Sequence, residues 1–245
     1  MAQLEFNQEK YLENMKNLSK RVNMIGLIAA ILTAVLAAAF IIVGSFGSTS
    51  WDFIPGIINY VWSYIKVIDY ALFIPGFLLA PVFVILMVCI HYYASLDKKI
   101  FSLIGLAFAI IYATVITADY FILWTVVLPS IIHGETAGLS LFSMYNPHGI
   151  FVALESVAYL MMSLALLLIA PVFQGGKIEN ALKWIFIIGF ILAIGSLFGV
   201  FLMNYDIVMF EIAILAIYCP LLVISGVLLA IIFRRNGNYI GSEVL

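Results

Sequence analysis

Three carboxylic acids lie inside long apolar stretches of this chain: Asp119, Glu155 and Glu211. Ionisable side chains within membrane-spanning helices are costly, and by default they point to a functional site. Counted from the nearer polar ends of their stretches, Glu211, Glu155 and Asp119 lie about 6, 10 and 13 Å deep, at ~1.5 Å per helical residue. We therefore expect the three carboxyl groups to form one layer near one face of a membrane.

A tyrosine shares a helical face with each acid. The spacing is four or seven residues for the pairs Tyr112 and Asp119, Glu155 and Tyr159, and Glu211 and Tyr218. Residues at these spacings lie on one stripe of a helix. His148 lies seven residues before Glu155, and Trp124 follows Asp119 by five. The pattern predicts a ligand-binding pocket that opens outward, with carboxylates above, phenols below and Trp124 in its wall.

The acids lack basic neighbours in their own stretches, which contain no Lys or Arg. Carboxylates in a low dielectric then need a proton, a metal ion or an organic cation. The expected ligand is therefore a cation, a proton-coupled solute or an amine-bearing small molecule. His148 together with the three acids is also a candidate metal or acid–base set. No HExxH motif occurs, and the identity of ligand, cofactor and any metal ligand stays open.

The composition indicates a membrane protein. Hydrophobic residues make up 65% of the 245 residues and charged residues only 10%, whereas about a quarter of a soluble domain is charged. The lipid bilayer is the partner that suits such a surface. The net charge of −2 and the absence of a basic stripe exclude a nucleic-acid partner.

Six apolar stretches are long enough for the roughly 20 residues that cross a ~30 Å core. They cover residues 22–45, 69–94, 100–128, 149–173, 184–204 and 207–233. Only helices satisfy their own backbone in lipid as single segments. The predicted fold is all-α: a polytopic six-helix transmembrane bundle over 22–235, preceded by an amphipathic interfacial helix over 1–21 and followed by a cytoplasmic tail over 236–245.

The distribution of basic residues predicts the orientation. Ten of the eleven Lys and Arg residues fall on one side of a six-span arrangement: Lys10, Lys16, Lys20, Arg21, Lys98, Lys99, Lys177, Lys183, Arg234 and Arg235. Only Lys66 falls on the other side. By the positive-inside rule, both termini are cytoplasmic in a cell membrane. One helix more or fewer would destroy this segregation, which supports six spans.

Small residues and prolines mark helix contacts and distortions. Gly195 and Gly199 form a GxxxG pattern, which predicts close packing inside the bundle or a homodimer contact. Pro75 and Pro81 lie inside the second apolar stretch and Pro220 inside the sixth, where they are expected to kink the helices.

Three function classes remain open from the sequence. The leading hypothesis is a small transporter or solute-binding protein that uses the acidic and aromatic pocket. The first alternative is a membrane enzyme that acts on a lipid or isoprenoid, with Glu155 and Asp119 as acid and base. The second is an accessory or scaffold subunit without a site. Nucleophilic catalysis has no support, because GxSxG and Gly-rich phosphate loops are absent.

Overall fold

The computed structural model describes residues 2–47, 73–135, 137–143, 146, 148–202 and 213–242. Within these ranges all regular elements are helices, and six of them are long and apolar enough to cross a membrane. The predicted all-α architecture with six long apolar helices is confirmed. Glu211 lies outside the described residues, so its predicted place in the pocket stays a prediction.

Seven α-helices follow one another in the described part of the chain. Their bounds are α1 Ala2–Gly47, α4 Phe73–Tyr93, α5 Lys99–Ile122, α6 Leu128–His133, α7 Ile150–Ile169, α8 Lys177–Leu202 and α10 Cys219–Ser242. Two segments are π-helical. Leu123–Val127 joins α5 to α6, and Ile214–Tyr218 leads into α10. Short 3₁₀ turns occupy Leu96–Lys98, Leu139–Phe142 and Ala170–Val172.

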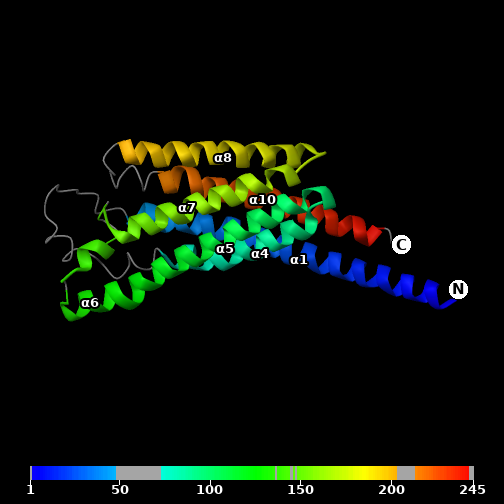
Figure 1. The fold of residues 1–245 in the computed structure, drawn as a ribbon, viewed down its shortest axis with the longest axis horizontal. Coiled ribbons are helices and arrows are strands. Elements are labelled where there is room, and N and C mark those ends of the chain that lie inside the picture. The colour runs from blue at the N-terminus through cyan, green and yellow to red at the C-terminus, as the bar shows by residue number, and fades with distance from the viewer. Residues whose placement is uncertain are drawn as a thin grey trace.

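The six long helices form a closed ring in which chain neighbours pack side by side. Helix α1 packs on α4, α4 on α5, α5 on α7, α7 on α8 and α8 on α10, and α10 returns to pack along α1 (Figure 1). Helices joined by short connections become antiparallel neighbours in bundles. The buried side chains from all six helices belong to one core.

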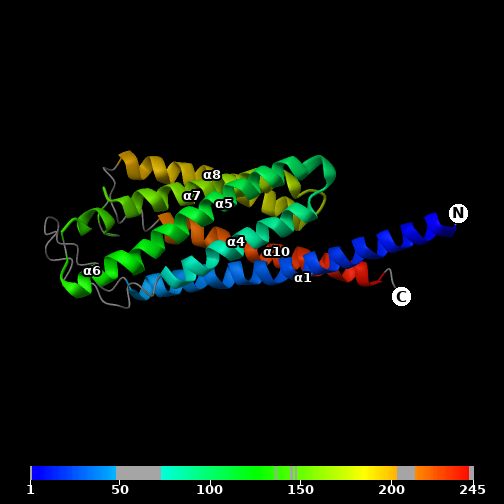
Figure 2. The ribbon, with the colours of Figure 1, turned by 60° about the horizontal axis from the view of Figure 1, so that its bottom comes forward.

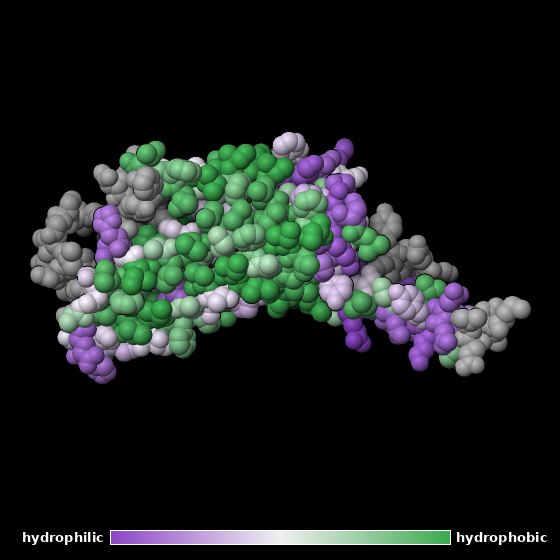
Figure 3. Space-filling view, viewed as in Figure 1, coloured by the Kyte–Doolittle hydropathy of each residue, from purple (hydrophilic) through white to green (hydrophobic). Residues whose placement is uncertain are grey.

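Both chain ends lie at one end of the bundle, together with the α4–α5 and α7–α8 connections (Figure 1). This end therefore contains the ten basic residues that the sequence placed on one side. Figure 3 shows an apolar belt across the middle of the visible face and polar side chains toward both ends. The 21 residues of α4 measure about 32 Å at ~1.5 Å per residue, which matches a ~30 Å hydrocarbon core.

The first helix differs from the prediction in its extent. The sequence predicted an interfacial helix over 1–21 and a separate span over 22–45, but α1 runs unbroken over 46 residues. No proline interrupts this stretch, and its only glycine before Gly44 is Gly26. Its N-terminal part projects past the rest of the bundle (Figure 2). At the other end of the chain, α10 stays helical to Ser242, past the predicted start of the tail at residue 236.

Helices α1 and α10 approach each other closely at Gly226. A Cβ atom added to Gly226 would stand 2.8 Å from the carbonyl oxygen of Ala30 and 3.0 Å from the backbone nitrogen of Ala34. Gly195 and Gly199 have no described atom within 4 Å of a Cβ built there. The described residues therefore show no close packing on these two glycines, and the homodimer contact stays a prediction.

Two prolines coincide with the π-helical segments. Each segment ends two residues before a proline, namely Pro129 and Pro220. Proline lacks an N–H donor, and its ring clashes with the carbonyl four residues earlier. That carbonyl belongs to Thr125 or Ala216, inside the widened turns. The predicted distortion at Pro220 is therefore present, and the third span continues through Pro129 to His133.

Candidate functional site

The buried face of α5 places Asp119 in the core. Its buried residues recur every three or four positions and include Tyr112, Ile116, Asp119 and Tyr120. This spacing is the helical period of a single face, so the position of Asp119 follows from the apolar pattern around it. Only 2% of Asp119 is exposed.

The facing helix α7 presents Glu155 in the same way. Val152, Glu155, Tyr159 and Met162 share its buried face, and Glu155 is 4% exposed. Gly105 of α5 permits the close approach, since a Cβ there would stand 3.0 Å from the carbonyl oxygen of Ala165. The two helices therefore bring the two acids into one apolar interior.

A tyrosine connects the helices at this point. The Tyr120 hydroxyl donates a hydrogen bond of 2.7 Å to Oε1 of Glu155. The Tyr120 ring lies 4.9 Å from the ring of Phe73 and 6.2 Å from that of Phe151, measured between centroids. Gly76 leaves room for it, because a Cβ there would stand 2.8 Å from Cε2 of Tyr120.

Asp119 is close enough to Glu155 for their charges to repel each other. Its Oδ2 atom is buried and has no hydrogen-bond partner among the described residues. A buried carboxylate oxygen without a donor is costly. The cost falls when the carboxyl group holds a proton or when a cation occupies the space beside it.

Below the acids, the predicted tyrosines do come together. The rings of Tyr159 and Tyr218 are 4.8 Å apart between centroids, and the Tyr159 hydroxyl lies within hydrogen-bonding reach of Tyr120. Tyr218 reaches the hydroxyl groups of Ser163 and Ser196. Hydroxyl groups therefore continue from Glu155 toward the middle of the bundle.

Tyr112 and Cys219 complete this buried polar cluster. Tyr112 lies within electrostatic range of both Glu155 and Cys219, and its ring meets the edge of Phe83 at 5.4 Å. Cys219 and Cys89 are both buried free thiols.

The other two predicted pocket residues, His148 and Trp124, lie at the start of α7 and in the first π-helical segment. His148 is exposed and precedes the first turn of α7, where its backbone N–H donates to the Asn146 side chain at 3.0 Å. Trp124 lies in the first π-helical segment and packs against Phe77 of α4, with ring centroids 5.0 Å apart. Within the described part of the chain, no three His, Cys, Asp or Glu side chains gather as a metal site.

A third buried acid, Glu179, was not predicted from the sequence. Glu179, in the first turn of α8, is 3% exposed and forms an ion pair with Arg235 of α10. Its Oε2 atom is buried without a hydrogen-bond partner among the residues described. Gly176 leaves room for it, because a Cβ there would overlap the Glu179 carboxyl group. This pair fastens α8 to α10 at the end of the bundle that holds both termini.

Comparisons with known proteins identify no relative: no family model, curated protein or solved structure matches this chain.

Proposed function

We propose that this chain is a transport or solute-binding protein of the cell membrane, in which the Asp119–Glu155 pair takes up and releases a proton or a small cation. The observation that carries the proposal is the burial of two neighbouring carboxyl groups in one apolar interior. Two carboxylates at such a site repel each other and lose their hydration, so both cannot stay ionised without a counter-charge. The pair is thus a binding place for one positive charge.

The surroundings of the pair support a transport role. The tyrosine and serine hydroxyls that extend from Glu155 through Tyr159 and Tyr218 offer donors and acceptors along the bundle interior. The two π-helical segments lie one turn from Asp119 and at Tyr218. Such segments are frequent at functional sites, and interrupted helices are a common setting for transport sites.

The proposed orientation places the end with both termini in the cytoplasm, since that end has the ten basic residues. The acid pair then lies near the outer face, with the pocket opening outward above it. The polar N-terminal part of α1 lies on the cytoplasmic side of the membrane in this arrangement.

Infrared spectroscopy of the reconstituted protein tests the charge state of the pair directly. We expect the carbonyl band of a protonated carboxylic acid at neutral pH, or its appearance when sodium or potassium is removed. The band should lose intensity or shift in Asp119→Asn and in Glu155→Gln, because each change removes one carboxyl group of the pair. Glu135→Gln, which changes an exposed acid in the connection after α6, is the matched control and should leave the band unchanged.

Flux through liposomes that contain a pH-sensitive dye tests transport. Gradients of sodium, potassium or methylammonium should drive proton movement with the wild-type chain, and each variant of the pair should slow the initial rate at least tenfold. Folded variants that behave like the wild type in both measurements would sink the proposal. Product formation from membrane lipids without any gradient would instead favour the enzyme hypothesis.

A further inference from the structure

A cavity of about 480 Å³ lies between α1, α4 and α10, at the end of the bundle that holds both termini. Its volume is within the range of small-molecule sites. Along α5, this end is about 30 Å from Asp119, from the 20 residues between Lys99 and Asp119 at ~1.5 Å each. The cavity is therefore separate from the acid pair, and the inference drawn from it does not depend on the proposed function.

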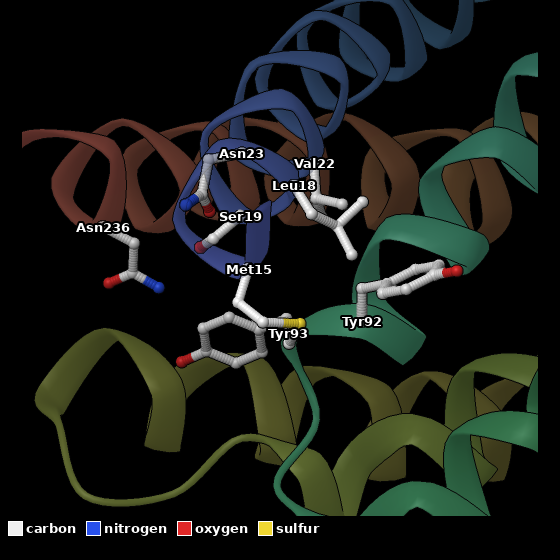
Figure 4. A pocket seen from close by; sticks show the side chains of 8 residues that line it. All are labelled: Met15, Leu18, Ser19, Val22, Asn23, Tyr92, Tyr93 and Asn236. Carbon is white, nitrogen blue, oxygen red and sulfur yellow. The ribbon is translucent and has the colours of Figure 1, made fainter. Parts of the chain in front are cut away.

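The lining of the cavity divides into a polar and an apolar side. In Figure 4 the polar side chains of Ser19, Asn23 and Asn236 lie on one side of the opening and those of Leu18, Val22 and Tyr92 on the other, with Met15 and Tyr93 between them. Such a site suits an amphiphilic ligand, because the polar side can bind the polar group and the apolar side can contact the hydrocarbon part.

The polar side is held in place by contacts with neighbouring helices. The Asn236 side chain lies near the Tyr93 hydroxyl (Figure 4). The preceding residue, Arg235, is fixed by its ion pair with the buried Glu179. Two carboxamides and two hydroxyl groups are thus arranged around one space. These groups can donate several hydrogen bonds to the oxygens of a phosphate.

Basic residues flank the lining residues in the chain. Lys16, Lys20 and Arg21 neighbour the α1 lining residues, and Arg234 precedes the Arg235–Asn236 pair on α10. Lys20, Arg21 and Arg234 are exposed. Basic residues at the cytoplasmic membrane surface attract anionic headgroups, and basic pockets between membrane helices bind them.

We infer that this cavity binds an acidic phospholipid. The phosphate lies against Ser19, Asn23 and Asn236, and the basic residues at this end of the bundle, Lys20 and Arg234 among them, supply the positive potential. The glycerol and the beginning of an acyl chain lie along Leu18 and Val22, and the chain then follows the exposed apolar surface of α1, which includes Met24 and Ile28.

Native mass spectrometry of the full chain in detergent, titrated with lipids of equal chain length, tests this inference. We expect phosphatidylglycerol to bind at least tenfold more tightly than phosphatidylcholine. Asn23→Leu combined with Asn236→Leu should weaken phosphatidylglycerol binding at least tenfold. Lys20→Gln combined with Arg234→Gln should remove the preference for phosphatidylglycerol, whereas Lys177→Gln, at the same end but on α8, should preserve it.

Folding of each variant is checked by its thermal unfolding, and Asn23→Ala with Asn236→Ala replaces the leucine pair if that pair does not fold. Equal binding of the two lipids, or wild-type binding by the folded double variants, would overturn the inference. Displacement of phosphatidylglycerol by glycerol 3-phosphate at similar concentration would also overturn it, because the cavity would then serve a soluble phosphate compound.

Discussion

The substitution Gly226→Ala tests the contact between α1 and α10. The new methyl carbon would stand 2.8 Å from the Ala30 carbonyl oxygen and 3.0 Å from the Ala34 backbone nitrogen. Ordinary contacts begin at 3.4 Å, so the helices must separate by up to 0.6 Å at this point. Because the obstructing atoms include backbone, they cannot turn aside as a flexible side chain can.

The cost follows from two opposing effects. Overpacking of a filled interior costs about 1–3 kcal/mol, and backbone obstruction places this case in the upper part of that range. Alanine is a better helix former than glycine by about 1 kcal/mol. The expected net loss is about 1–2 kcal/mol in the free energy of unfolding, measured by titration with SDS in mixed micelles and followed by circular dichroism.

Gly195→Ala is the matched control, since no described atom lies within 4 Å of a Cβ at that position. It should leave the free energy of unfolding unchanged or raise it by up to about 1 kcal/mol through helix propensity. Ala34→Gly should partly rescue Gly226→Ala, because the Ala34 Cβ is also 3.0 Å from the new atom and neighbouring sites couple. This account of the α1–α10 interface would be refuted if Gly226→Ala kept the wild-type free energy of unfolding while Gly195→Ala lowered it.

Further substitutions test the polar contacts, each measured by the same SDS titration. Tyr120→Phe removes the hydrogen bond to Glu155 and should cost about 1–3 kcal/mol; a wild-type value would show that this bond contributes nothing to folding. Arg235→Gln leaves the buried Glu179 without its ion partner and should cost about 1–3 kcal/mol, less than a fully buried pair because Arg235 is partly exposed. Gly176→Ala should cost a similar amount, since the added methyl group displaces the Glu179 carboxyl group. If the losses in free energy of unfolding from Gly176→Ala and Arg235→Gln simply add in the double variant, the two changes do not both act through the ion pair of Glu179.

Much of the fold is predictable from the sequence, because the length of each apolar stretch and the distribution of basic residues between stretches can be read without knowing how the helices pack. The positions of Asp119 and Glu155 also follow from local periodicity, since each lies on the buried stripe of its own helix. The sequence alone does not show that the two stripes face each other. That relation depends on the packing of α5 against α7, to which Gly105 contributes.

Tyr120 illustrates what a simple spacing rule misses. It directly follows Asp119, so it does not share the four- or seven-residue spacing used to pair acids with tyrosines. It does continue the four-residue series of Tyr112 and Ile116 on the buried face, and this signal was sufficient to find it.

Glu179 was missed for a different physical reason. In the sequence it lies among polar residues between two apolar stretches, where an acid is expected to be exposed. Its burial depends on Arg235, 56 residues away, and on the glycine turn at Gly175, whose φ is 89°. A contact between residues so far apart in the sequence does not produce a periodic pattern in the sequence around either residue.

The closed ring has a consequence for how the chain is connected. Because α10 packs along α1 and both termini leave the bundle at the same end, the first and last helices are related to each other much as any two consecutive helices are. A circularly permuted gene that links residue 242 to residue 2 and begins anew in the α4–α5 or α7–α8 connection would keep every helix in its place and every polar end on its own side. The order in which the helices enter the membrane would then become an experimental variable, separable from the architecture they finally build.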